Sequence, residues 1–475
     1  MLRNLVGGSW VEIGAESLPV YNPATAEVIE HVPLSASSEV DAAVGAAIPA
    51  YERWSRTPVM ERARLMFAFK AQLEEHFEEL AALVTRHHGK TLDEARGEVR
   101  RGIDVVDFAC GAPTLLQGRT LRNVSGGADQ DLYRFPVGVC AGIPPFNFPV
   151  MIPLWMFPLA VVAGNTFVLK PSERTPMGAV RLAELFLEAG FPEGVLNVVH
   201  GARAAVDALL AHPGVRAISF VGSAPVARHV YAEAARHGKR VQALGGAKNH
   251  MVVMPDADLT DVVPQVLSAT FGNAGERCLA GSVTVAVGKN PSELLDALVS
   301  GTRKLVVGPG DQEDVDIGPL IRHEHRQKVV AYIDKGAKEG ADVIVDGRAE
   351  MVRQGFFLGP TILDRVAPSM TVGREEIFGP VMSVSRAESL DQAISIANSM
   401  TLGNMAVLFT KSGRAAREFR ERVEAGMVGV NVPIAQPFAF FPFSGWKDSF
   451  FGDLHVHGAD GIEFYTRKKM FITRW

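Results

Sequence analysis

The chain has few cysteines, and the small number limits what kind of protein it can be. Its 475 residues include three, at Cys110, Cys140 and Cys278. The number is odd and the spacing matches no zinc pattern, so we expect neither a disulfide framework nor a bound metal. Free thiols are typical of a reducing compartment, and the first residues include no apolar stretch of the signal-peptide kind. We therefore expect a cytoplasmic protein.

Neither sign of charge is in large excess, which also excludes some partners. Lysine and arginine total 48 and aspartate and glutamate 53, for a net charge of −5. A chain of this kind gives no indication of a nucleic-acid partner. The hydrophobic share of 47% and charged share of 21% are ordinary for a globular enzyme. The length predicts two or three domains.

One long segment, residues 135–169, contains no charged side chain and is long enough to span a bilayer. It is interrupted, however, by prolines at positions 136, 144, 145, 149, 153 and 158. Prolines at this density, together with Asn147, would leave backbone groups unsatisfied in lipid. We interpret the segment as buried core and expect no membrane association.

Hydrophobic periodicity predicts an α/β fold. Residues 60–88 and 95–108 have helical spacing. Short apolar strands are then predicted at 166–169, 195–199 and 217–220, each followed by a helix, at 177–189, 204–211 and 225–236. This alternation is typical of a parallel sheet. A second alternating region includes 251–254, 262–271, 283–287 and 427–431. Two α/β domains with a boundary near 243–250 are therefore expected.

The expected nucleotide fingerprint, G-x-G-x-x-G, does not occur in the chain. The nearest feature is F-V-G-S at 220–223, where Gly222 would let a phosphate approach a helix N-terminus. An ordinary strand-to-helix turn explains it equally well. In K-P-S-E at 170–173, Lys170 and Glu173 could hold ribose hydroxyls or simply be solvated.

Two residues have the chemistry of a covalent site. A lone cysteine is usually an inert small hydrophobe, but Cys278 follows Gly275 and the cationic Arg277, and a nearby cation favours the thiolate. Asn147 lies in the apolar run P-F-N-F-P at 145–149, where its amide needs a partner. It could serve an oxyanion or cap the next helix.

Several motifs occur together in a familiar order. They are P-F-N-F-P at 145–149, K-P-S-E at 170–173, F-V-G-S at 220–223, L-G-G at 244–246, G-E-R-C at 275–278 and E-E-I-F-G-P-V at 375–381. With these, the chain resembles the aldehyde dehydrogenase superfamily over its whole length. The resemblance implies that Cys278 is the nucleophile and that Asn147, with the Cys278 backbone N–H, forms the oxyanion hole.

The resemblance also implies an NAD site. Lys170 and Glu173 would hold the adenosine ribose, Ser223 the pyrophosphate, and Glu376 and Phe378 the nicotinamide ribose and ring; the complete set is Phe146, Lys170, Glu173, Gly222, Ser223, Glu376 and Phe378. A carboxylate near the ribose 2′-hydroxyl would repel a 2′-phosphate, so NAD is favoured over NADP.

One departure from the family pattern concerns how the acyl group is released from the thioester that the cysteine nucleophile forms with the substrate. Members that hydrolyse it carry a glutamate just before L-G-G, where this chain has Ala243. Alanine cannot activate water, whereas a thiol nucleophile needs less help. With G-A-K-N-H at 246–250, F-S-G-W-K at 443–447 and F-Y-T-R-K at 464–468, the chain resembles the CoA-acylating methylmalonate-semialdehyde dehydrogenase branch.

That branch implies a specific reaction. The aldehyde would be methylmalonate or malonate semialdehyde, supplied by valine or inositol catabolism. It would be oxidised with NAD and decarboxylated, and the acyl group would be transferred to CoA to give propionyl-CoA or acetyl-CoA. Arg101 and Arg277 would hold the substrate carboxylate. Arg101 could instead be an exposed helix charge, because Arg96 and Arg100 lie beside it.

Three other functions remain as alternatives. The first is a hydrolytic NAD-dependent aldehyde dehydrogenase that releases a free carboxylic acid. The second is an acyl-phosphate reductase resembling γ-glutamyl phosphate reductase. The third is a non-enzymatic relative of the lens-crystallin kind, which the presence of Cys278, Asn147 and Glu376 disfavours.

The family architecture divides the chain into three parts. We expect a Rossmann-like NAD-binding domain at 1–112 and 133–244, an α/β catalytic domain at 245–450, and a bridging and oligomerisation element at 113–132 and 451–475. Residues 461–466 have strand character and are expected to pair with another subunit. A homodimer or homotetramer follows from the resemblance.

Overall fold

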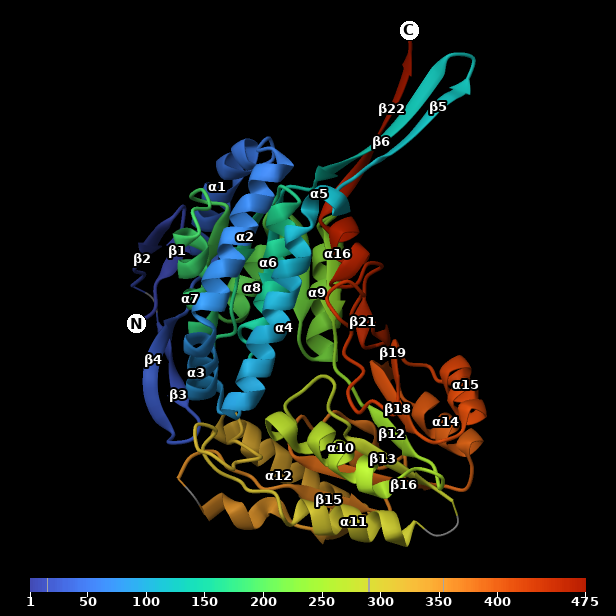
Figure 1. The fold of residues 1–475 in the computed structure, drawn as a ribbon. Coiled ribbons are helices and arrows are strands. Elements are labelled where there is room, and N and C mark those ends of the chain that lie inside the picture. Colours follow the sequence, from blue (N-terminus) through green and yellow to red (C-terminus); the bar gives the residue numbers. More distant parts are fainter. Residues whose placement is uncertain (15, 289–290, 353) are drawn as a thin grey trace.

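The computed structural model describes residues 1–14, 16–288, 291–352 and 354–475. Two α/β bodies lie one above the other, and a long β arm projects from the upper body with the C-terminus at its tip (Figure 1). The upper body contains the N-terminal half of the chain, and the lower body contains most of the C-terminal half. The α/β fold class that the sequence predicts is confirmed.

The upper body is built on an eight-stranded sheet in the order β2-β1-β9-β8-β7-β10-β11-β21. Its five central strands are parallel: β7 (Val139–Ile143), β8 (Thr166–Leu169), β9 (Leu196–Val198), β10 (Val215–Val221) and β11 (Arg240–Leu244). The chain moves outward from β7 to β9 and then returns to β10 on the other side of β7. This reversal creates a switch point between β7 and β10, where doubly wound sheets bind ligands at the carboxyl ends of their strands.

The remaining strands of this sheet are antiparallel edges, and helices cover both faces. The edge strands are β1 (Asn4–Val6), β2 (Ser9–Val11) and β21 (Phe450–Phe451), and a separate hairpin joins β3 (Ser17–Asn22) to β4 (Glu27–Pro33). The helices are α1 (Ser37–Trp54), α2 (Val59–Glu75), α3 (Phe77–His88), α4 (Leu92–Cys110), α5 (Ala112–Leu115), α6 (Met151–Val162), α7 (Met177–Glu188), α8 (Arg203–Ala211) and α9 (Ala224–Arg236).

The uncharged segment at 135–169 is core, as the sequence predicts. It forms β7, β8 and the intervening helix α6, in which every residue is buried. Within the described residues, no helix is long and apolar enough to cross a membrane. The helical pattern at 60–88 forms two helices, because the chain turns at His76 between α2 and α3.

The lower body has a seven-stranded sheet in the order β14-β15-β16-β13-β12-β18-β19, parallel except between β14 and β15. Its strands are β12 (His250–Val253), β13 (Val283–Val287), β14 (Asp342–Val345), β15 (Thr361–Asp364), β16 (Val381–Ala387), β18 (Met405–Phe409) and β19 (Met427–Val430). Its helices are α10 (Leu259–Phe271), α11 (Ser292–Thr302), α12 (His323–Lys338), α13 (Thr371–Arg374), α14 (Leu390–Asn398) and α15 (Gly413–Arg422). A short pair joins β17 (Leu402–Gly403) to β20 (Trp446–Lys447).

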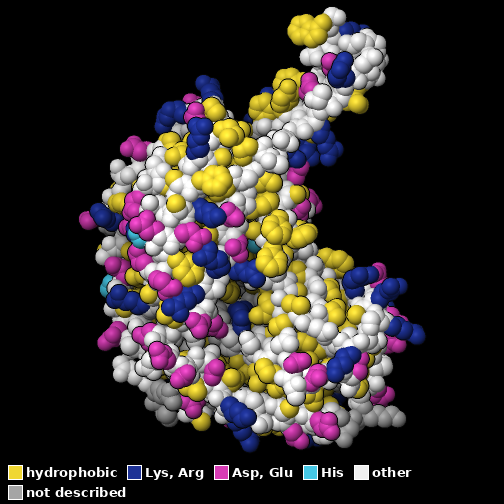
Figure 2. All heavy atoms as spheres, in the orientation of Figure 1, with side chains coloured by type: hydrophobic (Ala, Val, Ile, Leu, Met, Phe, Trp, Pro, Cys, Tyr) yellow, Lys and Arg dark blue, Asp and Glu magenta, His cyan; other side chains and the backbone are white. Residues whose placement is uncertain are grey.

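The arm is a three-stranded antiparallel sheet in the order β22-β6-β5, formed by β5 (Arg119–Ser125), β6 (Ala128–Pro136) and β22 (Thr466–Arg474). Hydrophobic side chains are visible along it (Figure 2), and its most exposed ones are Leu121, Tyr133, Met470, Ile472 and Trp475. An exposed apolar surface of this kind is typical of an interface.

The strand predicted at 461–466 is wrong, because most of this segment is helix. Helix α16 spans Gly458–Phe464, and β22 begins only at Thr466. Gly458, Gly461, Ile462 and Tyr465 are all buried, at helical spacing. The segment therefore packs against the upper body as one face of a helix, and the extended chain starts after it.

Candidate active site

Two cavities meet at Cys278. A cavity of about 560 Å³ lies at the carboxyl ends of β7, β8 and β10, and a smaller one of about 230 Å³ lies between α4, α6 and the loop that carries the cysteine. Of the described residues that line them, only Cys278 borders both. A group in the large cavity and a molecule in the small one could both reach its sulfur.

The loop that carries Cys278 is held in an unusual conformation. After α10 the backbone turns left-handed at Asn273 and Ala274, with φ of 54° and 51°. Gly275 continues the turn at φ 73°, and a Cβ there would lie 2.1 Å from the carbonyl oxygen of Gly379. Only glycine fits that position. The Cys278 carbonyl then accepts hydrogen bonds from side-chain amides of Asn249 and Asn404, at 2.9 and 3.0 Å.

The charge environment of Cys278 differs from the one expected from sequence. Burial, together with the nearby carboxylate of Glu376, raises the pKa of its thiol to about 12, and Arg277 opposes them with a smaller effect. Arg277 does favour the thiolate, as the sequence predicts, but its effect on the pKa is smaller than that of burial, so the thiol is protonated in this structure. The Arg277 guanidinium donates to the Ser268 carbonyl at 2.5 Å and lies near the charge of Glu94.

Asn147 is held against the same loop. Its Nδ2 donates to the Glu276 carbonyl at 2.9 Å, and it lines the large cavity together with Cys278. The helix-cap interpretation is wrong, because the first N–H groups of α6, at Val150 and Met151, donate to the carboxylate of Glu98 at 2.8 and 3.2 Å. The amide of Asn147 is therefore free of a capping role.

A buried ion pair fixes the backbone at Asn147. The Nζ of Lys90 lies 2.6 Å from the Glu98 carboxylate and donates to the Asn147 carbonyl at 2.8 Å. Neither side chain of the pair is exposed to solvent. Glu98 thus ties α4 to the start of α6, and Lys90 ties the end of α3 to Asn147.

The small cavity presents one arginine of helix α4. Arg101 lines it, with its guanidinium 4.7 Å from the ring centroid of Phe438. Arg96 and Arg100 instead form ion pairs with Glu78 and Glu74 on the exposed face of the helix. The interpretation of Arg101 as one more exposed helix charge therefore does not hold. Arg277 also lines the cavity.

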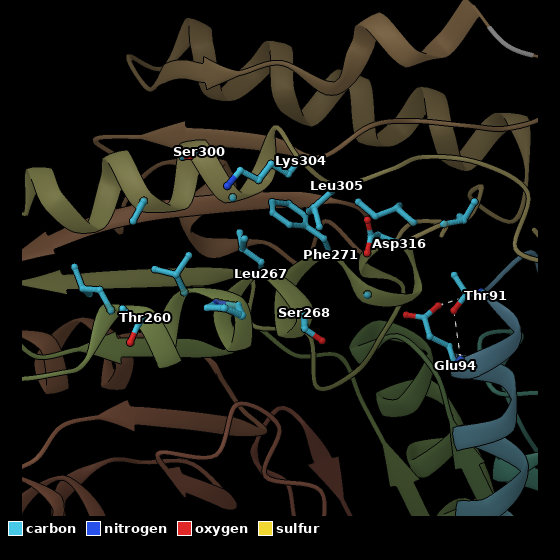
Figure 3. A pocket seen from close by; sticks show the side chains of 18 residues that line it. Thr91, Glu94, Thr260, Leu267, Ser268, Phe271, Ser300, Lys304, Leu305 and Asp316 are labelled. Carbon is cyan, nitrogen blue, oxygen red and sulfur yellow. Dashed lines mark hydrogen bonds between the residues drawn. The ribbon is translucent and has the colours of Figure 1, made fainter. Parts of the chain in front are cut away.

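The carboxylates that border the small cavity are engaged elsewhere. Glu98 is paired with Lys90, and Glu94 accepts hydrogen bonds from the backbone N–H groups of Asn273 and Thr91, at 2.5 and 3.2 Å. Glu94 also borders a separate hollow of about 770 Å³ between α10 and α11 (Figure 3). Ala243 lines neither cavity, and its side chain is buried in the apolar cluster around β10 and β11. Neither engaged carboxylate is available to activate water in the small cavity.

All seven residues that the sequence assigned to a cofactor line the large cavity: Phe146, Lys170, Glu173, Gly222, Ser223, Glu376 and Phe378. Lys170 Nζ lies 3.3 Å from the carboxylate of Glu173, at the end of β8. Ser223 precedes α9, whose N-terminus follows the switch-point strand β10. The sequence motifs therefore converge on one cleft, although they are far apart along the chain.

Glu376 and Phe378, which the sequence assigned to the nicotinamide end of the cofactor, are each held in place by neighbouring groups. Burial raises the pKa of Glu376 to about 7, and one of its oxygens accepts from the backbone N–H of Ala247 at 2.9 Å. Phe378 has a φ of 59°, and its ring meets that of Phe146 edge to face at 5.9 Å.

Sequence reasoning missed several residues that line the large cavity, among them Arg174, Arg203, His325 and Lys328. The last two lie on α12, in the lower body, and no local pattern distinguishes them from ordinary exposed helix residues. Arg174 directly follows the K-P-S-E motif, and its guanidinium lies 5.1 Å from the ring centroid of Phe146. Its position in the sequence was the one available signal.

These features define a class of protein: an α/β enzyme in which a cysteine lies between a doubly wound nucleotide cleft and a small-molecule pocket. The model of the aldehyde dehydrogenase family matches residues 10–471, and the chain belongs to this family.

Several individual proteins and solved structures are similar to this chain over nearly its whole length. The chain is 56% identical to malonate-semialdehyde dehydrogenase 2 of Geobacillus kaustophilus, covering 100% of this chain and 99% of the relative. It is 54% identical to malonate-semialdehyde dehydrogenase of Halalkalibacterium halodurans, covering 100% and 98%. The methylmalonate-semialdehyde dehydrogenase structure from Oceanimonas doudoroffii matches with a TM-score of 0.98, 47% identity and coverage of 100% and 98%. A Sinorhizobium meliloti structure given the same enzyme name, solved with NAD, matches with a TM-score of 0.98, 45% identity and the same coverage.

Proposed function

We propose that this chain oxidises malonate or methylmalonate semialdehyde with NAD through a thioester at Cys278, and that the acyl group, after decarboxylation, passes to CoA as acetyl-CoA or propionyl-CoA. The observation that carries the proposal is that Cys278 borders both cavities. The names of the relatives support the semialdehyde class, and the relative solved with NAD supports the cofactor. A hydrolytic enzyme is not favoured.

The residues of the large cavity fit NAD. At Gly222 a Cβ would lie 2.5 Å from the ring of Phe220, so the turn before α9 has no room for a side chain at this position. The free N–H groups at a helix N-terminus suit a pyrophosphate. Lys170 and Glu173 present an amine and a carboxylate for ribose hydroxyls, and the carboxylate favours NAD over NADP.

The chemistry begins at the sulfur. Burial keeps the thiol of Cys278 protonated before the reaction, so the thiol gives up its proton to solvent as the sulfur attacks the aldehyde carbon, and the resulting alkoxide needs fixed donors. Asn147 has two amide protons, and only one is used by the Glu276 carbonyl. The second, with the backbone N–H of Cys278, can hold the oxyanion. NAD held in the large cavity would supply the acceptor for the hydride that leaves this carbon, so that the carbonyl re-forms as a thioester on Cys278.

The thioester carbonyl then makes decarboxylation possible. It lies two carbons from the substrate carboxylate, so it can accept the electron pair that loss of CO₂ releases, and the enolate that results takes up a proton from solvent to give the acetyl or propionyl thioester. Arg101 and Arg277 would hold the carboxylate in the small cavity until that step. The thiol of CoA then attacks the thioester and releases Cys278.

We expect steady turnover to require CoA. Without it the enzyme should release about one NADH per active site in a burst and then slow, because Ala243 is apolar and Glu94 and Glu98 are engaged. Stopped-flow absorbance of NADH with and without CoA, with mass spectrometry of the product, checks this. Steady CoA-independent formation of a free acid would show that the enzyme is hydrolytic.

We expect Arg101→Leu to lower kcat/KM for malonate semialdehyde by an amount that corresponds to roughly 2–4 kcal/mol of activation free energy, because the substrate carboxylate loses its cationic partner. Oxidation of propanal, which has no carboxylate, should be nearly unchanged. Arg100→Leu is the matched control, since this neighbouring arginine pairs with Glu74 away from the cavity. Equal losses on both aldehydes would mean that Arg101 has only a structural role.

We also propose the family's division of the chain and its assembly. The two sheets support an NAD-binding domain at 1–112 and 133–244 and a catalytic domain at 245–450. The projecting arm, with its exposed apolar side chains, supports a bridging element at 113–132 and 451–475 in a homodimer or homotetramer. A cytoplasmic location, with semialdehyde supplied by valine or inositol catabolism, completes the proposal.

A further inference from the structure

Glu276 is a buried carboxyl group beside the catalytic loop to which the proposed reaction gives no role. It directly precedes Arg277 and Cys278, its side chain is 0% exposed, and it lines neither cavity. Its backbone carbonyl accepts the side-chain amides of Asn147 and Asn273, both at 2.9 Å. Its side chain extends in another direction, towards helices α3 and α12.

Two histidines meet this carboxyl. The Nε2 of His88, at the end of α3, lies 3.8 Å from one oxygen, and the Nε2 of His325, on α12, lies 3.5 Å from the other. The second oxygen also accepts from the backbone N–H of Ile321 at 3.3 Å. The first has no hydrogen-bond partner. Glu276 therefore joins the cysteine loop to two other elements.

The contact with His325 reaches the nicotinamide end of the cleft. The same Nε2 lies 2.6 Å from the backbone carbonyl oxygen of Phe378. A carbonyl can only accept, so Nε2 must carry the proton. In this structure the N–H donates to Phe378, and the Glu276 oxygen lies 3.5 Å from the same nitrogen as a second acceptor that is not hydrogen-bonded to it. Phe378 is a residue with a left-handed backbone, φ 59°, and its ring lies 6.3 Å from that of His325.

We propose that Glu276 is a positioning residue for the nicotinamide end of the cofactor cleft, which acts through His325 on the backbone of Phe378. The inference rests on the proposed assignment of this cleft to NAD. When Glu276 is protonated, the N–H of His325 is left to the Phe378 carbonyl. When it is ionised, its charged oxygen competes for that N–H, since hydrogen bonds to charged acceptors are stronger. Phe378 then loses its partner.

The groups around Glu276 determine the pH at which its carboxyl group ionises, which lies on the alkaline side of neutrality. Burial raises the pKa of Glu276 to about 8, while the N–H of Ile321 and the cations Arg174 and Lys90 lower it by less. Burial also lowers the pKa of His325 to about 4, and that of His88 well below its usual value, so neither ring supplies a charge. The carboxyl group is therefore neutral below about pH 8 and ionised above it, and the hold on the cofactor should weaken as pH rises.

Binding of NAD alone, measured by calorimetry from about pH 6.5 to about pH 9.5, tests the proposal without any reaction. The Kd of the wild-type protein should rise by up to about tenfold between pH 7 and pH 9, since only about a tenth of Glu276 is still protonated one unit above its pKa. Glu276→Gln, a neutral group of the same size, should lack this rise. Glu376 in this cleft and the neighbouring Lys248 both have a pKa shifted to about 7, so the Kd of the variant is compared with that of the wild type at the same pH.

Two further variants distinguish a positioning role of Glu276 through His325 from a general effect of removing a carboxylate from the protein. His325→Gln offers two N–H groups, one for each acceptor, and should also lose the alkaline rise. Glu293→Gln makes the same substitution at an exposed position of α11 and should retain it. A rise that persists in Glu276→Gln, or no rise in the wild type, overturns the proposal. If the wild type binds no NAD at any pH, the proposed function itself fails.

Discussion

Cys278→Ala should lower NADH production from malonate semialdehyde by at least about a thousandfold, because no other group can form the thioester. The binding of NAD should remain, since the side chain removed is small and the rest of the large cavity is intact. Initial rates followed by NADH absorbance and calorimetry with NAD check the two parts separately.

Cys110→Ala is the matched control. This thiol is buried at the end of α4, outside both cavities, and burial raises its pKa to about 11. Its removal should leave the rate close to that of the wild type. If Cys278→Ala retained more than about a thousandth of wild-type turnover, Cys278 would not be the nucleophile.

Asn147→Ala should slow acylation by roughly 10²–10³, the typical effect of losing one oxyanion donor. The amide is held 2.9 Å from the Glu276 carbonyl, so its second N–H points from a fixed position and needs no reorganisation during the reaction. Single-turnover formation of NADH measures the step directly, before CoA is required.

The fold should survive this substitution, because Lys90 still holds the backbone carbonyl at position 147 and Glu98 still caps α6. A thermal melt close to that of the wild type would verify it. An unchanged rate of acylation in a folded Asn147→Ala protein would assign the oxyanion to other donors.

Sequence patterns predicted the helices and strands well wherever the hydrophobic residues followed either the helical or the strand repeat clearly. The helix predicted at 177–189 is α7 at Met177–Glu188, and the strand predicted at 166–169 is β8 with the same bounds. In both, local periodicity and burial agree. At 461–466 they conflict: the residues have high strand propensity, but Gly461 and Ile462 pack as one face of α16. Tertiary packing overrode the local preference there.

Charges were harder to place from sequence than elements. Arg96, Arg100 and Arg101 lie within one and a half turns of helix α4, and only the packing of α4 against the rest of the body decides that the third faces a cavity. Arg277 adjoins Cys278 in the chain, yet one N–H of its guanidinium donates to the Ser268 carbonyl and the side chain lines the small cavity. Adjacency in sequence says little about which group a long side chain reaches.

The sequence by itself determined the family and the order of the motifs, and it predicted seven of the residues that line the large cavity, because each motif is short and its side chains act close to their own backbone. Only the tertiary structure decided how the motifs combine. It placed Cys278 between two cavities, tied Asn147 to Glu276, and brought His325 from α12 to the carbonyl of Phe378. These contacts join residues far apart in the chain, and they exist because the upper and lower bodies meet around the loop that carries Cys278.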